Sequence, residues 1–289
     1  MVFANRARTE YKINSSAKQP IGVFDSGIGG ITVLKELMRK LPNENFIYLG
    51  DTARLPYGTK SADVVRKYSV QNMDFLITKN VKAVVVACNT ASTQIFETTY
   101  KNIPVYNVID PGARKAALTT ENLKIAVLAT RATIATNSYT EKIKLHNPNA
   151  EVLTQACPLF VPLAEEGWHD DPITNLIAFR YLQYLRAAEV DTVVLGCTHY
   201  PLLKLAISKV FGPGVTLIDS GEVLAQQISD DINKNDVTHE SSKAQPEAFH
   251  TGNLHICLTD SGVQFENLCL RLLSEVTNKT PQFETVSVI

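Results

Sequence analysis

Short apolar runs alternate with longer amphipathic segments along most of the chain. The runs are rich in Val and Ile on both faces, as strands of a parallel sheet are when helices cover both sides of it. This alternation predicts an α/β fold with parallel sheets. The predicted strands lie at 20–25, 45–51, 81–88, 103–110, 123–130, 150–157, 190–197 and 214–219. The predicted helices lie at 29–42, 61–80, 90–101, 136–147, 201–211 and 220–235, with a further helical stretch that ends at Glu189.

The second half of this pattern looks like a copy of the first. Cys88 and Cys197 each end an apolar run, and the next strand ends in the pattern I-D-x-G at Asp110 and at Asp219. The two cysteines are 109 residues apart, and so are the two aspartates. Two landmarks at one offset favour a duplication over chance, so equivalent strand ends of two similar, pseudosymmetric halves are expected to face each other across a cleft.

The repeat gives a domain prediction. Residues 1–19 form a polar N-terminal extension, 20–112 a first α/β domain and 113–224 a second one. Residues 225–289 contain a polar loop at 236–247 followed by a strand, a helix and a final strand or tail. We expect this last part to pack back on the first domain and complete it.

Charge and composition exclude several classes of function. The 289 residues carry 28 basic and 29 acidic side chains, a net charge of -1. This balance gives no electrostatic reason to expect a nucleic acid or an anionic membrane surface as a partner. No apolar run reaches the roughly 20 residues that span a bilayer. The first nineteen residues lack the apolar centre of a secretory signal.

The cysteines indicate a reducing compartment. There are five, an odd number, and no C-x-x-C pair occurs. A disulfide framework or a structural zinc site is therefore not expected, and a cytoplasmic location is. Cys157, Cys257 and Cys269 are interpreted as small buried hydrophobes.

Polar residues gather where predicted strands end, which is where open parallel sheets bind ligands. They follow three strands, as Asp25 and Ser26, Cys88 and Asn89, and Cys197, Thr198 and His199. A thiol at a strand terminus next to a helix start is a candidate for reaction, because the helix N-terminus lowers a thiol pKa.

Other segments leave two interpretations open. The turn DSGIGG at 25–30 either binds an anion through its backbone or is a tight turn with Ser26 as a helix cap. Tyr57 and Gly58 either contact a ligand or belong to an ordinary loop. Glu165 and Glu166 either act in the site or form a solvated face.

Four segments, VFDSGIGG, DTARLPYG, VVVACNTAS and VVLGCTHYPLL, resemble the motifs of the bacterial glutamate racemases of the cofactor-independent aspartate/glutamate racemase superfamily. They run in the family's order from Val23 to Leu203. The extension and the last sixty residues carry no such motif.

The resemblance implies two similar α/β domains with the active site between them. It implies that Cys88 and Cys197 exchange the α-proton of glutamate, with Cys88 acting on D-glutamate and Cys197 on L-glutamate. Asp25, His199 and a helper glutamate, Glu165 with Glu166 as the alternative, would assist. The substrate contacts carried over by motif are Asp25, Ser26, Tyr57, Gly58, Asn89, Thr90, Thr198 and His199. No pyridoxal phosphate, other cofactor or metal is implied, and the expected role is to supply D-glutamate for peptidoglycan.

Two thiols suit this chemistry. Racemisation removes a proton from one face of a carbon and returns one to the other face, so two groups must flank it. One must be ionised while the other is protonated, and a thiol pKa of about 8.5 needs only modest tuning for this.

The sequence is also compatible with three other functions. An aspartate or hydantoin racemase would share the cysteine pair. A metal- or thiol-binding protein would use Cys88, Cys197 and His199 without catalysis. A racemase-like fold could also serve as a regulator that binds a partner. Assembly is open as well, and a homodimer is one state that the sequence allows.

Overall fold

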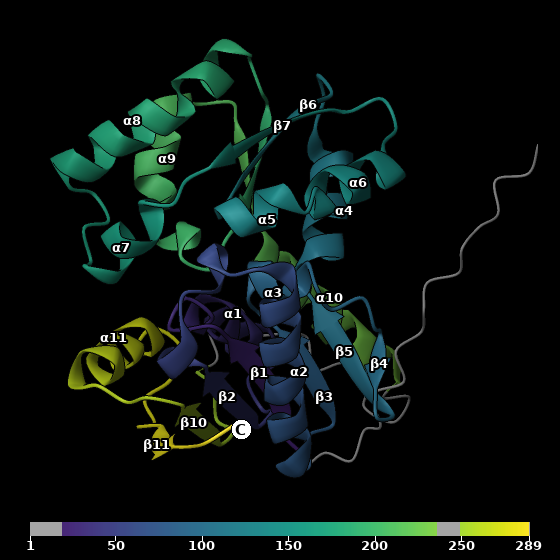
Figure 1. Ribbon diagram of the computed structural model, residues 1–289, viewed down its shortest axis with the longest axis vertical. Coiled ribbons are helices and arrows are strands. Elements are labelled where there is room, and N and C mark those ends of the chain that lie inside the picture. Colours follow the sequence, from purple (N-terminus) through teal and green to yellow (C-terminus); the bar gives the residue numbers. More distant parts are fainter. Residues whose placement is uncertain (1–18, 236–248, 289) are drawn as a thin grey trace, which may run out of the picture.

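A computed structural model describes residues 19–235 and 249–288 of the chain. Within these ranges the chain folds into two lobes, one above the other in Figure 1. The first lobe comprises 19–108, 220–235 and 249–288, and the second lobe comprises 109–219. The predicted extension, apart from Gln19, and the predicted loop at 236–247 lie outside the described residues.

The first lobe is built on a sheet of seven strands among the described residues, in the order β11-β10-β2-β1-β3-β5-β4. All neighbours are parallel except β4 and β5. The elements are β1 (Ile21–Asp25), α1 (Ile31–Lys40), β2 (Phe46–Gly50), α2 (Ala62–Thr78), β3 (Ala83–Val86), α3 (Asn89–Ser92), β4 (Thr99–Tyr100), β5 (Ile103–Asn107), α10 (Ser220–Asn235), β10 (Leu254–Leu258), α11 (Val263–Leu273) and β11 (Gln282–Thr285). Two single-turn 3-10 helices, Thr52–Arg54 and Tyr57–Thr59, follow β2.

The second lobe is built on a parallel four-stranded sheet in the order β7-β6-β8-β9. Its elements are α4 (Ile109–Thr119), β6 (Lys124–Ala129), α5 (Arg131–Ala135), α6 (Ser138–His146), β7 (Glu151–Ala156), α7 (Phe160–Glu165), α8 (Pro172–Ala187), β8 (Thr192–Gly196), α9 (Lys204–Phe211) and β9 (Thr216–Asp219). A 3-10 helix, Tyr200–Leu203, links β8 to α9. The predicted α/β fold with parallel sheets is confirmed, apart from the antiparallel edge strand β4.

The two sheets repeat one strand order. In the first lobe β2, β1, β3 and β5 are neighbours, and in the second lobe β7, β6, β8 and β9 take the same places. Cys88 follows β3 and Cys197 follows β8, so the two cysteines occupy equivalent positions in the two sheets.

Two helices cross between the lobes. α4 follows a strand of the first sheet, yet its apolar residues pack in a core of the second lobe with Ile125 and Val127. α10 follows β9 of the second sheet, and its residues Leu224 and Ile228 pack in a core of the first lobe. The chain therefore passes between the lobes just before the predicted boundaries at 112 and 224. The domain limits themselves stay a prediction.

One predicted helix is wrong in extent. Residues 90–101 were expected to be helical, but α3 ends at Ser92, and Thr99 and Tyr100 form β4. The physical reason is local: Thr and Tyr favour extended backbone, and this pair finds a partner strand in Ile103 and Pro104.

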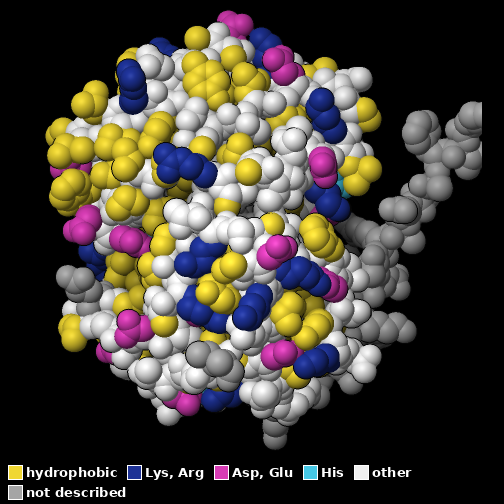
Figure 2. Space-filling view, in the orientation of Figure 1, with side chains coloured by type: hydrophobic (Ala, Val, Ile, Leu, Met, Phe, Trp, Pro, Cys, Tyr) yellow, Lys and Arg dark blue, Asp and Glu magenta, His cyan; other side chains and the backbone are white. Residues whose placement is uncertain are grey.

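The surface carries both signs of charge. Figure 2 shows Lys and Arg side chains interspersed with Asp and Glu on the face in view, and apolar side chains gathered over α7 and α8. Ile173, Leu176 and Phe179 of α8 are among the exposed apolar residues. Among the described residues, no helix combines the length and the apolar character needed to cross a membrane.

Burial along α8 predicts where the stability of the second lobe resides. We expect Leu182→Ala to lower the free energy of unfolding by about 2–5 kcal/mol, because Leu182 is fully buried in the core and its loss leaves a cavity. Leu176→Ala on the same helix is the matched control, because Leu176 is 69% exposed. It should change the free energy by about 0.5 kcal/mol or less. Urea unfolding measures both, and equal effects would contradict this account of the core.

Candidate active site between the lobes

The strand ends of the two lobes meet with almost no space between them. A Cβ atom at Gly29 would collide with Oγ1 of Thr198 and the ring of His199, so only glycine fits at this position. Thr32 places its hydroxyl 2.8 Å from the carbonyl oxygen of Thr198. The turn after β1 and the loop after β8 therefore dock directly on each other, although these two strands are not equivalent in the repeat.

Asp25 ends β1 and is fully buried. Its Oδ2 accepts a hydrogen bond from the backbone of Gly27 at 3.0 Å, and Thr198 donates to its Oδ1 at 3.4 Å from the other lobe. Burial raises the pKa of Asp25, while the charge of His199, the backbone of Gly27 and Gly30, and Thr198 lower it. A carboxyl group buried at this junction thus depends on partners from both lobes.

Cys88 lies at the start of α3 and is 5% exposed. Its thiol lies 3.7 Å from Oγ of Ser26, and the backbone N–H of Ala91 donates to Sγ at 3.4 Å. Burial and the negative charge of Asp25 raise the pKa of Cys88 well above its usual range, and the contacts with Ala91 and Ser26 lower it only in part. Cys88 is therefore a protonated thiol near neutral pH.

Cys197 has different neighbours from Cys88. His199 Nδ1 lies 3.8 Å from Sγ of Cys197, and His199 Nε2 lies 3.0 Å from Oε1 of Glu165. Burial alone would lower the pKa of His199, but the hydrogen bonds with Cys197 and Glu165 outweigh it and raise the pKa to about 10. His199 is a cation at neutral pH, and its ring lies beside the Cys197 sulfur. Glu165, not Glu166, supplies the carboxylate contact of His199.

Cys88 and Cys197 are near neighbours in space. Cys88 contacts Ser26, and Asp25, the neighbour of Ser26 in sequence, accepts a hydrogen bond from Thr198, the residue after Cys197. One sulfur follows a strand of the first lobe and the other follows the equivalent strand of the second lobe.

Hydroxyl and amide groups border the two thiols. The hydroxyls of Thr90, Thr130 and Thr133 lie 3.0 Å from one another, and they bring both lobes together. Asn89 Oδ1 accepts a hydrogen bond from the hydroxyl of Tyr139 at 2.7 Å. Asn89 Nδ2 is buried without a partner, which makes it an available donor for a ligand.

Thr130, Thr133 and Tyr139 were missed by sequence reasoning. A signal for Thr130 was present, because it directly follows β6, the strand whose place in the second sheet matches that of β1 in the first. Tyr139 lies within a helix and had no strand-end signal.

The loop after β2 is fixed by a buried ion pair. Asp51 is fully buried, and Nε of Arg54 lies 2.8 Å from its Oδ2. Tyr57 donates its hydroxyl to the same carboxylate and accepts from Asn72 at 3.1 Å. The Tyr57 hydroxyl, expected to face a ligand, is thus already engaged with the protein. Gly58 follows it in sequence, and a Cβ there would lie 2.9 Å from Cβ of Thr130 in the second lobe.

The groups proposed for a metal-binding rival do not form a compact ligand set. Among the described residues, the set of His, Cys and acidic side chains close enough to hold an ion is His255, Cys257 and Glu284, within 4.8 Å on β10 and β11. Cys88, Cys197 and His199 are not part of it. Lys79 already pairs with Glu284 at 3.3 Å.

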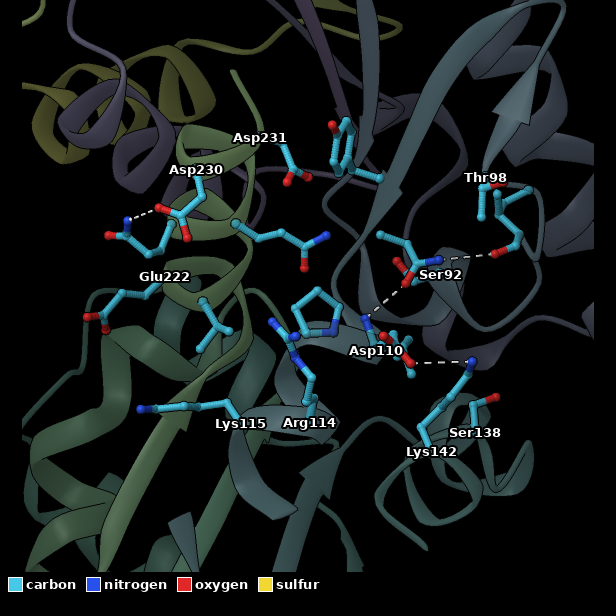
Figure 3. Close-up of a pocket in the computed structure, with 18 of the residues that line it drawn as sticks. Ser92, Thr98, Asp110, Arg114, Lys115, Ser138, Lys142, Glu222, Asp230 and Asp231 are labelled. Carbon is cyan, nitrogen blue, oxygen red and sulfur yellow. Dashed lines mark hydrogen bonds and ion pairs between the residues drawn. The ribbon is translucent and has the colours of Figure 1, made fainter. Parts of the chain in front are cut away.

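A cavity of about 1110 Å³ opens on another side of the lobe junction. Figure 3 shows Arg114 and Lys115 of α4 on one side of it and Asp230 and Asp231 of α10 on another. Its lining contains neither Cys88 nor Cys197. It is therefore separate from the thiol pair.

The structure shows the site in a closed arrangement. Cys88, Cys197, Asn89, Thr90 and Thr198 are each at most 6% exposed. A ligand would need the lobes to move apart to reach groups as buried as these, and closure afterwards would exclude water.

Comparison with known proteins finds relatives that match over most of the chain. A family model described as Asp/Glu/Hydantoin racemase matches residues 28–228. The glutamate racemase of Geobacter metallireducens is 47% identical over 255 residues, which are 88% of this chain and 92% of that protein. A glutamate racemase from Bacillus anthracis has a TM-score of 0.83 at 33% identity, covering 93% of this chain and 97% of its own. The Francisella tularensis glutamate racemase, solved with D-glutamate, has a TM-score of 0.81 at 37% identity, covering 94% and 98%.

The contact between Glu165 and His199 predicts a shift in titration. In Glu165→Gln the imidazolium loses a charged acceptor, so the pKa of His199 should fall from about 10 toward the ordinary value near 6.5. NMR titration of protein with labelled histidine measures this, and His199→Gln identifies the signal. Glu166→Gln is the matched control and should leave the titration unchanged. Equal shifts in both variants would show that Glu165 has no special contact.

The different surroundings of the two thiols predict selective alkylation. Cys88 and Cys197 are almost equally buried, at 5% and 6% exposed, so access does not distinguish them. Iodoacetamide reacts with the thiolate, and the pKa of Cys88 is strongly raised whereas Cys197 has a cation beside it. We expect Cys197 to be labelled before Cys88, as read by peptide mass spectrometry. Faster labelling of Cys88 would overturn this assignment of charge.

Proposed function

The chain belongs to the Asp/Glu/Hydantoin racemase family, and on that premise we propose that it interconverts L- and D-glutamate by a two-thiol transfer of the α-proton. Glutamate is favoured over aspartate or hydantoins because the relatives of 41–47% identity are glutamate racemases that match over most of their length.

The observation that carries this proposal is the unequal pair of thiols. Cys88 and Cys197 follow equivalent strands of two lobes that face each other. Cys88 has a raised pKa, while Cys197 lies beside the His199 cation. One protonated thiol and one thiolate are what a two-base reaction requires before substrate binds.

The proton transfer then balances in a single turnover. The Cys197 thiolate removes the α-proton of L-glutamate and becomes a thiol. The Cys88 thiol gives its own proton to the opposite face of the same carbon and becomes a thiolate. D-glutamate leaves, and the reverse reaction starts from this exchanged state. The His199 cation compensates the charge on Cys197 while that sulfur is a thiolate.

Neutral donors would stabilise the carbanion-like transition state. Asn89 Nδ2 is unpartnered, and the hydroxyls of Thr90, Thr130 and Thr133 can turn toward a carboxylate. In a closed site without water, fixed dipoles stabilise developing charge strongly. Each well-placed donor contributes about 3 kcal/mol to the stability of the transition state. Ser26, Thr198 and the backbone of Gly58 complete the proposed substrate contacts.

The wider role follows from the reaction. We propose that the enzyme acts in the cytoplasm and that the D-glutamate it forms is used for peptidoglycan. All five cysteines are free thiols, which a reducing compartment maintains. No pyridoxal phosphate or metal enters the proposed mechanism, and assembly as a homodimer stays a prediction.

Racemisation in heavy water tests the two-thiol mechanism. The thiol that donates has already exchanged, so D-glutamate first formed from L-glutamate should carry deuterium at Cα while unreacted L-glutamate keeps hydrogen. The D-to-L direction should behave alike. Mass spectrometry of both isomers at low conversion measures this. Early deuterium in recovered substrate, or unlabelled product, would contradict two bases on opposite faces.

Substitution of the thiols provides the controls. Cys88→Ser and Cys197→Ser should each lower kcat by about 10²–10⁴-fold, because a hydroxyl is a poor base at neutral pH. Cys257→Ala and Cys269→Ala remove buried thiols of the first lobe outside the site and should keep substantial activity. A loss of activity in these folded controls would show that the thiols are assigned wrongly.

A further inference from the structure

The side chain of Asn89 is a buried amide with one engaged end and one free end. Asn89 is 3% exposed. Its Oδ1 accepts a hydrogen bond from the Tyr139 hydroxyl at 2.7 Å, whereas its Nδ2 is buried and has no partner. An unsatisfied buried donor is costly, so this group is suited to a ligand that supplies an acceptor. It belongs to the residue next to Cys88.

Tyr139 is held rigidly in the opposite lobe. It belongs to α6 and is 3% exposed. A Cβ at Gly196 would lie 3.1 Å from one edge of its ring, and a Cβ at Gly112 would lie 3.5 Å from the other. Gly196 directly precedes Cys197. The ring thus fits between two glycines, one of which adjoins the second catalytic thiol, and its hydroxyl has a fixed position.

We propose that Tyr139 is a positioning residue that sets the direction of the Asn89 amide when the lobes close. An asparagine presents an acceptor at one end of its amide and donors at the other. Because the Tyr139 hydroxyl donates to Oδ1, the NH2 end remains free for a substrate carboxylate. A reversed amide would present oxygen to that carboxylate and repel it. This inference rests on the proposed function.

The hydrogen bond also couples amide direction to closure. Asn89 is in the first lobe and Tyr139 in the second, so the bond forms only when the two lobes are together. The donor is therefore fixed in the same step that excludes water from the site. In the open state the amide is free to rotate, because Tyr139 is its only hydrogen-bond partner recorded among the described residues.

A double-mutant cycle tests whether Tyr139 acts through Asn89. Tyr139→Phe keeps the ring between the glycines and removes only the hydroxyl. We expect it to lower kcat/KM for glutamate about 10-fold, which corresponds to the free energy of about one hydrogen bond. In an Asn89→Ala background the same change should cost less than about 2-fold, because its target is gone. An equal loss in both backgrounds would overturn the proposal and indicate a structural role.

The variant Asn89→Asp tests the direction of the Asn89 amide without altering Tyr139. The carboxylate still accepts from the Tyr139 hydroxyl, but it presents oxygen where the NH2 was. We expect Asn89→Asp to lower kcat/KM more than Asn89→Ala does. A smaller or equal loss would contradict the proposed direction of the amide. Tyr184→Phe is the matched control for removal of a tyrosine hydroxyl. Tyr184 belongs to α8, and its hydroxyl donates to the carbonyl oxygen of Thr154 in β7 at 2.9 Å, away from Asn89. It should change kcat/KM less than about 2-fold, on the scale of a surface substitution.

A measurement without catalysis separates this inference from the proposed function. The side-chain amide of Asn89 gives a pair of NMR signals in ¹⁵N-labelled protein, assigned by their loss in Asn89→Ala. Tyr139→Phe should shift these signals, whereas Tyr184→Phe should not. Signals unaffected by Tyr139→Phe would overturn the positioning role. Absence of racemisation by the unaltered protein would instead overturn the proposed function, whatever the NMR result.

Discussion

The close approach of the two lobes at Gly29 is the constraint on which the rest of the site depends. Only a residue without a side chain allows the loop of Thr198 and His199 to lie against the turn after β1. That contact brings Thr198, the residue after Cys197, to Asp25, whose neighbour Ser26 contacts Cys88. A methyl group at this position would separate the strand ends, and with them the groups that would flank a single carbon atom.

Burial then makes each charge depend on a specific partner. Asp25 is fully buried, and its ionised form is supported by His199, two backbone N–H groups and Thr198. His199 keeps its proton because Cys197 and Glu165 accept from it. In a low-dielectric site these interactions are stronger than in water. The two chemically identical thiols have different surroundings, because the negative charge of Asp25 helps to raise the pKa of Cys88 whereas Cys197 lies beside the His199 cation.

The two helices that connect the lobes determine which contacts must break when the lobes move apart. α4 and α10 each leave one sheet and pack on the other, so the two connections between the lobes run side by side as packed helices. Contacts of the site, such as Thr90 with Thr130 and Asn89 with Tyr139, cross the same junction. Opening of the lobes must break these weak polar contacts, while the helix crossings can stay packed.

The sequence by itself determined the α/β class, the repeat and the candidate thiols. These follow from apolar periodicity and from polar residues at strand ends, which are local features of the chain. Its family resemblance also indicated His199 and the pair Glu165 and Glu166. The pattern placed the end of the helix predicted at 90–101 too late and missed β4, which exists only through its pairing with β5. It also missed α4, which begins at Ile109, inside the strand predicted at 103–110.

Tertiary structure alone decided which side chains meet. It placed Glu165 rather than Glu166 on His199, directed the Tyr57 hydroxyl to Asp51, and brought Thr133 and Tyr139 to the junction. It also gave Cys88 and Cys197 opposite electrostatic surroundings. Spacing along a chain fixes which face of a strand or helix a residue occupies, but contacts between residues of different lobes depend on how the two sheets dock, and no local pattern encodes that arrangement.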